Sequence, residues 1–446
     1  MNPNIFKAYD IRGKVGTELT PEVCWNIGQA LGDWLPNDGP VAVGRDMRPD
    51  SEELSKAVIE GLRLQGREVL DVGLVSSDMI YFTVGHFGLA GGAMVTASHN
   101  PGDYNGMKLC REEAKPIGID TGLADIREAA MAGNFEPAAE KGAIKSQDVK
   151  DEWIKHVLSF VDADSWPTYK VAIDAGNGML GVIAPVLAEH VPLNITPMYY
   201  ELDGTFPNHP ANPLLTEGTV DIRQKIIDNQ LDFGIAFDGD GDRAVLIDEK
   251  GEVVGGTVMT ALLSQYFLSK NPGATILYNA ICGRAVKETV LRNSGKAIRT
   301  KVGHSYIKAD MRAHDAVFAG EHSSHYYFRD NWSADSGLIA AMIATQVLVE
   351  SGKKLSELVA EYKTYTAITE TNFEVADKEL ALEHIKEVFS DGTQDELDGI
   401  TVNYENAWFN VRASNTEPLL RLNAEARTED ELNTIVTRVK QVIQQN

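Results

Sequence analysis

The chain has 446 residues, which is too many for one ordinary hydrophobic core and predicts three or four domains. Its net charge of −24 argues against nucleic acid or an anionic membrane as a partner. No stretch approaches the roughly 18 apolar residues of a membrane span. The first residues lack a signal-peptide pattern, and the three cysteines are widely separated. We therefore expect a soluble, cytoplasmic protein without disulfides.

The first third of the chain alternates between strand and helix patterns, which is typical of an α/β unit. Small apolar residues predict a buried strand that runs directly into a polar turn at 96–101. The first long helix is expected to begin at a Ser51 cap. In chain order, the expected elements are strand 41–43, helix 51–65, strand 68–72, strand 91–95 and helix 146–161.

Two further α/β units follow, and each again has a strand that leads into a polar loop. Their expected elements are strands 170–173 and 233–237, then strand 275–278, helix 284–292, strand 317–319 and helix 335–350. From about residue 369 the pattern changes to a small α+β domain, with strands near 402–411 and 419–424 and a helix from 429. We therefore expect four domains, over 1–150, 151–255, 256–367 and 368–446.

The polar turn at 96–101 carries a hydroxyl and an imidazole directly after the buried strand. Ser98 is a candidate nucleophile with His99 beside it, because a serine hydroxyl reacts only when a base or an electrophile assists it. An ordinary Ser/Asn turn is the commoner explanation of an isolated Ser-His pair. This loop alone therefore assigns no function.

The segment 238–243, Asp-Gly-Asp-Gly-Asp-Arg, places three carboxylates at alternate positions of a flexible turn. Oxygen ligands on such a turn suit Mg²⁺ or Ca²⁺, and three like charges packed together without a cation are costly. An EF-hand is disfavoured because Arg243 stands where its loop needs glycine and because both flanks have strand patterns. The loop therefore predicts a cation site, with Arg243 placed to meet an anion that bridges to the metal.

Two later loops are weaker signals when each is taken alone. The segment 320–325, Gly-Glu-His-Ser-Ser-His, offers groups that hydrogen-bond well to sugar hydroxyls. The segment 412–418, Arg-Ala-Ser-Asn-Thr-Glu-Pro, offers a guanidinium, hydroxyls and turn amides that can hold a phosphate. Either segment is also compatible with an ordinary turn.

Two other patterns compete for a functional role. The segment 176–181 matches G-x-G-x-x-G after a strand, as in a dinucleotide-binding dehydrogenase. That function leaves the other loops unexplained, and a tight turn between strand and helix accounts for the glycines. Arg45 and Arg48 follow a strand and could bind phosphate, although a structural ion pair is the favoured role.

The four loop motifs occur in a fixed order, at spacings suited to one loop per domain. With Lys-Ala-Tyr-Asp-Ile-Arg-Gly at 7–13 and Asn-Gly-Met-Lys at 105–108, they resemble the α-D-phosphohexomutases along the full length of the chain. The bacterial phosphomannomutase and phosphomannomutase/phosphoglucomutase branch is the most similar. This resemblance implies three similar α/β domains with mixed sheets and a smaller C-terminal α+β domain around a central cleft.

The resemblance also implies a role for each motif residue. The phosphoryl group would be carried by Ser98, and Mg²⁺ would be held by Ser98, Asp238, Asp240 and Asp242. The implied catalytic residues are Ser98, His99, Lys108, Arg12, Arg243 and His304. The implied substrate contacts are Tyr9, Glu321, Ser323, His325, Arg412, Ser414, Asn415 and Thr416.

The implied activity is interconversion of mannose 1-phosphate and mannose 6-phosphate through a phosphoserine enzyme and a hexose 1,6-bisphosphate. Lys108, Arg12 and His304 stay equal candidates for proton transfer. Ile281 stands where some dual-specificity members have lysine, and His322 stands where relatives often have methionine. Phosphoglucomutase or dual specificity is therefore the alternative, and a metal-dependent phosphatase is a further rival. The sequence sets no oligomeric state.

Overall fold

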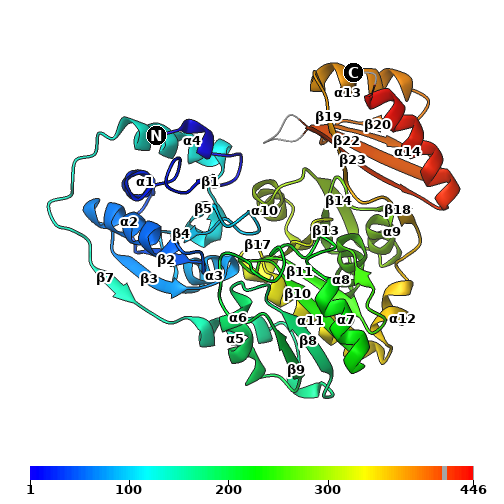
Figure 1. The fold of residues 1–446 in the computed structure, drawn as a ribbon, viewed down its shortest axis with the longest axis horizontal. Coiled ribbons are helices and arrows are strands. Elements are labelled where there is room, and N and C mark those ends of the chain that lie inside the picture. Colours follow the sequence, from blue (N-terminus) through cyan, green and yellow to red (C-terminus); the bar gives the residue numbers. More distant parts are fainter. Residues whose placement is uncertain (414–418, 445–446) are drawn as a thin grey trace.

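The computed structural model describes residues 1–413 and 419–444. Four separate sheets follow one another along the chain, and we call the units built on them domains I to IV (Figure 1). Domains I to III are α/β units with mixed sheets, and domain IV is a smaller α+β unit, so the predicted fold class is confirmed. Within the described residues, no helix combines the length and the apolar character needed to cross a membrane.

Domain I is built on a sheet with the strand order β1-β5-β4-β2-β3-β7, and β6 pairs with β5. β3, β2 and β4 are parallel, whereas β5 is antiparallel to both β4 and β1. The elements are β1 Ile11–Lys14, α1 Pro21–Trp34, β2 Val41–Arg45, α2 Ser51–Leu64, β3 Val69–Leu74, α3 Ser77–Phe87, β4 Gly91–Val95, β5 Tyr104–Arg111, β6 Lys115–Pro116, α4 Leu123–Ala132 and β7 Ile144–Ser146.

Domains II and III repeat the core of this arrangement, with strand orders β9-β8-β10-β11-β12 and β14-β13-β15-β16-β17. In both, the first two pairings are parallel and the last two are antiparallel. Domain II consists of α5 Lys150–Leu158, β8 Lys170–Asp174, α6 Leu180–Ala188, β9 Asn194–Met198, α7 Val220–Asn229, β10 Phe233–Phe237, β11 Ala244–Asp248 and β12 Val253–Val254. Domain III consists of α8 Gly256–Lys270, β13 Thr275–Asn279, α9 Arg284–Arg292, β14 Lys296–Thr300, α10 His304–Ala313, β15 Ala316–Gly320, β16 Tyr326–Phe328, β17 Ala334–Asp335, α11 Gly337–Ser351 and α12 Leu355–Ala360.

Domain IV is built on an antiparallel sheet with the order β18-β23-β22-β21-β20, and β19 also pairs with β23. Two helices complete it, and its apolar residues form a separate hydrophobic cluster. The elements are β18 Thr366–Ala367, β19 Thr371–Glu374, α13 Lys378–Val388, β20 Thr393–Asp395, β21 Ile400–Asn403, β22 Ala407–Ala413, β23 Leu419–Ala426 and α14 Glu429–Ile443.

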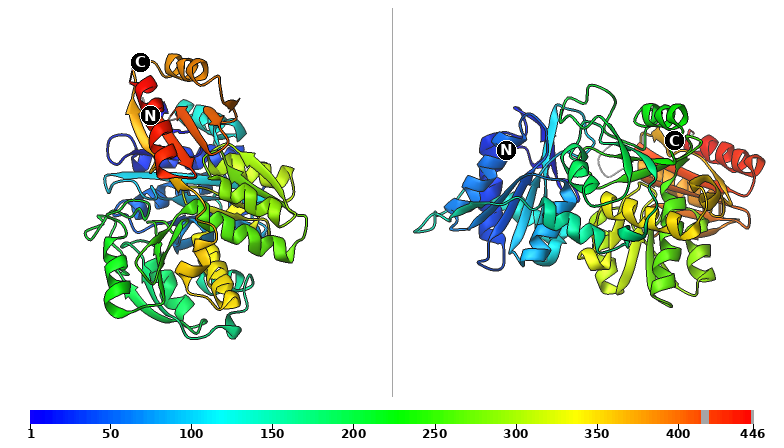
Figure 2. Two further views of the ribbon diagram at one scale, coloured as in Figure 1. Left: turned by 90° about the vertical axis from the view of Figure 1, so that its right-hand side faces the viewer. Right: turned by 90° about the horizontal axis from the view of Figure 1, so that it is seen from below.

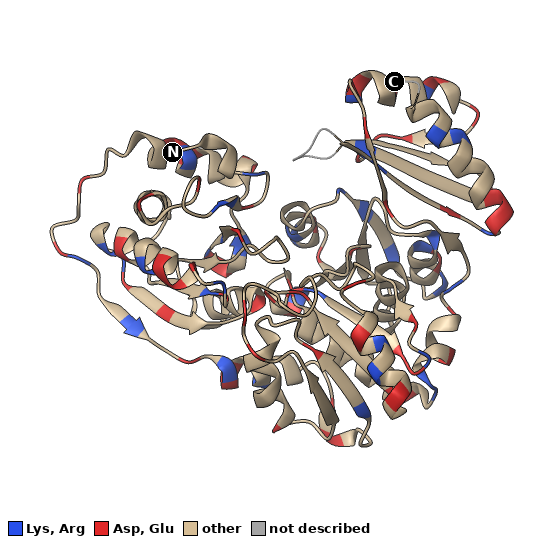
Figure 3. Cartoon of the chain, in the orientation of Figure 1, with Lys and Arg blue, Asp and Glu red and all other residues tan. Residues whose placement is uncertain are grey.

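The central strand of each α/β domain is buried over its whole length. β4, β10 and β15 are all five-residue apolar runs without an exposed position, as expected for strands covered on both faces. The domains follow one another along an arc, with domain I at one end and domain IV at the other (Figure 1 and Figure 2). Lys, Arg, Asp and Glu are spread over all four domains (Figure 3). The sheets therefore place the ends of three equivalent strands toward the middle of the molecule.

Two local predictions are wrong. Ser51 is the first helical residue and not the cap, because Asp50 occupies the cap position and the Ser51 hydroxyl donates to Asp46. The helix expected over 146–161 covers only Lys150–Leu158. Of the predicted residues before it, only Ser146 lies in a strand, because β7 pairs in parallel with β3, and 147–149 are neither helix nor strand. Strands on both sides of the acidic loop are confirmed as β10 and β11.

Candidate functional site

Three of the four motif loops meet, and each follows the central strand of its sheet. The Ser98 hydroxyl lies 3.1 Å from Oδ2 of Asp238, which joins the loop after β4 to the loop after β10. Arg243 and His325 form an isolated antiparallel bridge, and Nε of Arg243 lies 3.2 Å from Nε2 of the histidine. Side chains more than 200 positions apart in sequence are thus placed in one site.

Ser98 lies at the tip of its loop in a left-handed backbone conformation, with φ at 51°. Non-glycine residues in this region are strained, and such strain concentrates at functional sites. The backbone N–H of Ser98 donates to Oγ1 of Thr96 at 2.9 Å, and its hydroxyl lies 3.2 Å from Nδ1 of His99. The serine is only 3% exposed, so its hydroxyl is aimed at the aspartates and not at solvent.

The three aspartates of the acidic loop are buried, and one oxygen of each lies within 4.8 Å of the others. Burial and the neighbouring carboxylates raise the pKa of Asp238 well above its usual value. Within the described residues, Oδ1 of Asp240 and Oδ1 of Asp242 are buried without a hydrogen-bond partner. Unsatisfied oxygens and crowded negative charge are the properties of a site that favours a cation.

Lys108 on β5 partly neutralises this cluster. Its ammonium donates to Asp240 at 2.6 Å and also to Asp242. Burial alone would lower the pKa of Lys108, but these two carboxylates outweigh burial and raise it. Arg12 on β1 approaches from the same sheet, donating to Asp10 at 2.9 Å and to the carbonyl of Thr96 at 3.1 Å. Domain I therefore contributes two fixed positive charges beside the serine loop.

Arg243 adds a third positive charge from domain II. Its backbone N–H donates to Asp238 at 3.1 Å, and its Nε lies 3.7 Å from the same carboxylate. The charge of Arg243, together with burial, lowers the pKa of His99 well below its usual value. These surroundings favour the neutral imidazole next to Ser98, which has one donor and one acceptor nitrogen.

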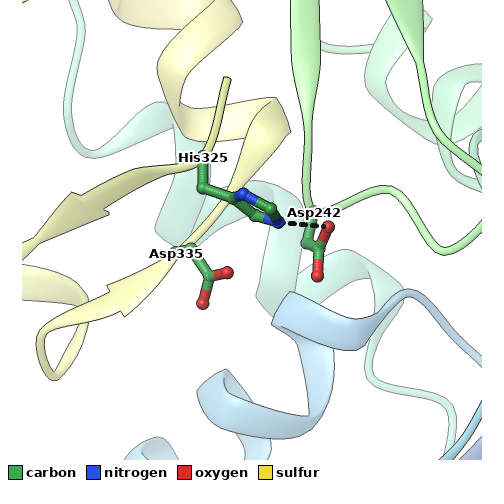
Figure 4. Close-up of side chains that lie close together, drawn as sticks. All are labelled: Asp242, His325 and Asp335. Carbon is green, nitrogen blue, oxygen red and sulfur yellow. Dashed lines mark ion pairs between the residues drawn. The ribbon is translucent and has the colours of Figure 1, made fainter. Parts of the chain in front are cut away.

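The loop of domain III presents Glu321, Ser323 and His325 to the same region. The imidazole of His325 lies between Asp242 and Asp335, with Nε2 3.4 Å from Asp242 (Figure 4). Ser323 and Glu321 lie on its other side, at 3.1 Å and 3.6 Å from Nδ1. Glu321 is held by Asn279 and Tyr327, which both donate to it. The arrangement gives a fixed set of donors and acceptors at the edge of the acidic cluster.

His304 and Tyr9 form a second group near this edge. Their rings lie 5.5 Å apart, and the hydroxyl of Tyr9 donates to the carbonyl of Val302 at 3.1 Å. His304 is the first residue of α10, and both of its ring nitrogens are buried without a partner among the described residues. Burial, with a smaller contribution from Lys308, lowers the pKa of His304 to about 3.

Arg412 is placed differently from the other site residues. It lies at the end of β22 and donates to Glu370 at 3.0 Å, and Glu370 also accepts from Asn423 at 2.9 Å. Arg412 lines a cavity of about 460 Å³ that Tyr9 of domain I and Lys301 of domain III also line. Ser414, Asn415 and Thr416 lie outside the described residues.

The structure also gives a role to two patterns that competed in the sequence. Gly178 of the G-x-G-x-x-G segment packs on the acidic loop, where an added Cβ would lie 2.6 Å from the carbonyl oxygen of Gly239. Gly178 therefore serves the close packing of two loops, and Gly181 packs in the same way on the backbone of Tyr200. Arg48 pairs with Asp46 at 3.4 Å, as favoured, and it also binds the serine loop, which sequence reasoning missed. No sequence signal marks that contact, because its partners are backbone carbonyls.

Lys308 and Asp335 also escaped the sequence analysis. The ammonium of Lys308 lies 2.7 Å from Oδ1 of Asp335 and 3.6 Å from the centre of the Tyr81 ring. Lys308 is completely buried. A lysine in a helix and an aspartate in a short strand carry no motif, so only the fold pairs them.

Family models match four consecutive parts of the chain. They describe the alpha/beta/alpha domains I, II and III of phosphoglucomutase/phosphomannomutase, over residues 3–136, 151–251 and 255–365, and the C-terminal domain, over 370–442. Among curated relatives, the phosphomannomutase of Salmonella montevideo is 39% identical and aligns over 99% of each chain. The "Phosphohexose mutases" of Xanthomonas campestris pv. campestris are 40% identical over 98% of each chain.

A solved structure has the same architecture. The crystal structure of a phosphoglucomutase/phosphomannomutase family protein from Burkholderia thailandensis superposes with a TM-score of 0.92 at 30% identity, covering 100% of this chain and 98% of that one. The relatives thus share all four domains and their order, as well as the fold that joins the three loops. The chain belongs to the phosphoglucomutase/phosphomannomutase family.

Proposed function

We propose that this protein is a phosphomannomutase, an isomerase that interconverts mannose 1-phosphate and mannose 6-phosphate. Ser98 would carry the phosphoryl group, and a mannose 1,6-bisphosphate would be the intermediate. The observation that carries the proposal is the Ser98 hydroxyl at 3.1 Å from Asp238, inside a buried cluster of three carboxylates. Full-length relatives named phosphomannomutase, 39% and 40% identical, support the same activity.

The acidic loop fits a divalent cation, and we propose Mg²⁺. Its donors are carboxylate oxygens, which this ion prefers, and two of them are buried without hydrogen-bond partners among the described residues. Asp238, Asp240 and Asp242 would hold the ion together with the group on Ser98. When bound, Mg²⁺ would supply positive charge that neutralises the phosphoserine.

The cationic side chains around Ser98 would also neutralise the negative charge of the phosphoryl group, and they are already in place. Arg243 and Lys108 are already fixed by the aspartates, so they need no reorganisation when charge develops on a transferring phosphoryl group. Phosphoryl transfer depends mainly on such positioning and charge stabilisation. The sugar hydroxyl must also lose a proton, and we propose Arg12, Lys108 and His304 as the candidates to assist this step.

The remaining motif residues would bind the sugar and its second phosphate. Glu321, Ser323 and His325 present donors and acceptors to sugar hydroxyls next to the acidic cluster. Arg412, with Ser414, Asn415 and Thr416, would hold the phosphate that is not reacting, with Tyr9 lining the same cavity. This loop would recognise a phosphate irrespective of the carbon that carries it, so the bisphosphate could bind in both orientations.

Phosphoglucomutase or dual activity is the alternative, because the domain III loop would contact hydroxyls that mannose and glucose share. Ile281 is buried in domain III and offers no charge to a substrate. Initial rates with the 1-phosphates of mannose and glucose decide between them. A much higher kcat/KM for glucose 1-phosphate would reverse the assignment. We propose that the enzyme acts in the cytoplasm, in keeping with three buried free cysteines.

The test of the proposed function is Ser98→Ala. Purified wild-type protein should carry phosphate on Ser98, detected by intact mass and peptide mapping, and Ser98→Ala should lose nearly all turnover. Trapped 1,6-bisphosphate and retained phosphate distinguish a mutase from a phosphatase. Phosphate found only on other residues, with Ser98→Ala still active, would show that the site lies elsewhere.

A further inference from the structure

Arg48 uses both terminal nitrogens of its guanidinium group on the backbone of the serine loop. One terminal nitrogen donates to the carbonyls of Ser98 at 2.9 Å and Asn100 at 2.6 Å. The other donates to the carbonyls of Pro101 at 2.8 Å and Tyr104 at 2.9 Å. Arg48 is 3% exposed, so these hydrogen bonds are shielded from water.

The partner of Arg48 holds the same loop from its amide side. Asp46 lies 3.4 Å from Nε of Arg48 and accepts from the hydroxyl of Thr96 at 2.7 Å. That hydroxyl in turn accepts the backbone N–H of Ser98 at 2.9 Å. Both backbone polar groups of Ser98 are therefore fixed by this one buried pair, directly at the carbonyl and through Thr96 at the amide.

A loop of domain II covers the same guanidinium. The ring of Phe206 lies 5.2 Å from the guanidinium carbon of Arg48, a distance at which cation–π attraction contributes. Gly204 packs on the backbone of Arg48, since an added Cβ would lie 2.6 Å from its Cα. Phe206 also borders Gly239 in the acidic loop, at 3.5 Å from the Cβ position of that glycine. The serine loop and the acidic loop thus share this packing.

We propose that Arg48 is the positioning residue for Ser98, holding the strained serine backbone so that its hydroxyl faces the acidic loop. This inference rests on the proposed function, in which Ser98 is the reacting group. A left-handed backbone conformation at a serine persists only when surrounding contacts hold it in place. The four hydrogen bonds from Arg48 to loop carbonyls provide such contacts. Arg48 touches the loop backbone and not the substrate, so its loss should lower kcat with little change in KM.

Lysine is an informative replacement, because it keeps the charge beside Asp46 but has three donors and no planar fork. Arg48→Lys should lower kcat by roughly 10- to 100-fold, since a misplacement of about 1 Å can cost that much. Its KM for mannose 1-phosphate and its melting temperature should stay near wild type. The rate at which a hexose 1,6-bisphosphate phosphorylates Ser98 should fall in parallel with kcat.

Arg48→Ala adds a chemical-rescue arm to this experiment. Millimolar guanidinium chloride should restore part of its kcat, and sodium chloride at equal ionic strength should not. Arg45→Ala is the matched control, because Arg45 ends β2, three residues before Arg48, and its side chain pairs with the exposed Glu52 at 3.6 Å. That variant should behave as wild type.

Two results would overturn the proposal. One is a wild-type kcat and a wild-type Ser98 phosphorylation rate in Arg48→Lys. The other is a folded Arg48→Ala enzyme whose kcat responds equally to guanidinium chloride and to sodium chloride. If Arg48→Ala does not fold, Arg48→Lys decides alone. Failure of the proposed function has a different signature, since it would appear as wild-type turnover in Ser98→Ala.

Discussion

The negative charge of the acidic cluster determines the roles of the single residues around Ser98. Asp238, Asp240 and Asp242 are buried together, and Lys108 is the cation that contacts two of them. Like charges at this spacing repel one another unless a counter-charge lies among them. Lys108 and Arg243 supply part of it, and the unpartnered carboxylate oxygens indicate that a further cation is accommodated. Loss of one carboxylate should therefore affect metal binding more than folding.

Asp240→Asn tests whether the loss of one carboxylate affects metal binding more than folding. It removes one negative charge while keeping the size of the side chain, so it should weaken Mg²⁺ binding and slow turnover without unfolding the chain. Activity and calorimetric titration with Mg²⁺ measure both effects. Asp228→Asn is a control of equal charge on an exposed face of domain II. An Asp240→Asn enzyme with full activity at limiting Mg²⁺ would contradict the metal assignment.

His209 offers a residue-scale prediction on pH that is independent of the metal. Nε2 of His209 lies 3.2 Å from Asp174, with Asp221 also near enough to act on it. Burial lowers the pKa of His209, but Asp174 outweighs it, and the net pKa is raised. A raised folded-state pKa adds stability that is complete below about pH 6.5 and is lost as pH rises through the folded pKa.

His209→Gln should therefore flatten the pH dependence of the melting temperature. The stability that this ion pair contributes should be lost as pH rises above about 6.5, so the difference in melting temperature between wild type and the variant should narrow over that range. His190→Gln is the control, because His190 is an exposed histidine in the same domain. An identical slope in wild type and His209→Gln would mean that this ion pair adds no net stability.

At the scale of elements, one connection explains why three loops form the site. In each α/β domain the central strand is followed by an antiparallel partner, and the motif loop is the turn between them. Because the three domains share this topology, their three turns lie at equivalent edges of the three sheets. Because the domains pack side by side, these edges face one another. The repetition of one unit thus creates a site that no single domain contains.

Sequence patterns predicted the buried strands, the loops after them and the change of pattern at domain IV. Each rests on local information, such as apolar runs and short motifs. The helix predicted at 146–161 is shorter in the structure, and its predicted first residue, Ser146, belongs to β7, whose partner β3 lies far away in the chain. Arg48 and Lys308 could not be assigned, since their partners are carbonyls or single charges far away in the chain. Long-range partners leave no local pattern.

Gly178→Ala tests the packing between two elements of domain II. A Cβ at this position would lie 2.6 Å from the carbonyl oxygen and 2.8 Å from the Cα of Gly239, so the acidic loop must shift. The variant should show lower kcat and weaker apparent Mg²⁺ affinity, with roughly 10- to 100-fold loss in kcat. Gly255→Ala is the control, because nothing lies within 4 Å of its Cβ position. Wild-type kinetics in Gly178→Ala would show that the loop tolerates displacement.

At the scale of the whole molecule, domain IV is joined to domain III and lies across from domain I, at the other end of the arc (Figure 1). Arg284 at the start of α9 donates to the carbonyls of Glu405 at 2.7 Å and Ala407 at 2.8 Å. The backbone N–H of Val302 donates to Asp398 at 2.8 Å. These contacts join domain IV to domain III, and a cavity lies between domain IV and Tyr9 of domain I. A substrate that fills this cavity would contact three domains at once.

Arg412→Ala tests whether domain IV acts as a clamp on the substrate. Arg412 is 8% exposed and held by Glu370, so its guanidinium is already oriented at the cavity wall. A charge-assisted pair with phosphate contributes about 2–3 kcal/mol, so the variant should lose roughly 30- to 150-fold in kcat/KM. It should also release more 1,6-bisphosphate per turnover, because the intermediate must stay bound while it reorients.

The same variant should keep its phosphoserine and its Mg²⁺ affinity, since both belong to domains I and II. Arg438→Ala is the matched control, because Arg438 lies on α14 and pairs with exposed Asp391 at 3.5 Å. Remote binding energy from domain IV would be used to orient the reacting hydroxyl at Ser98, and closure would exclude water that could hydrolyse the phosphoserine. An unchanged kcat/KM in Arg412→Ala would mean that the second phosphate is held by other cationic groups at this cavity, with Lys301 the next to replace.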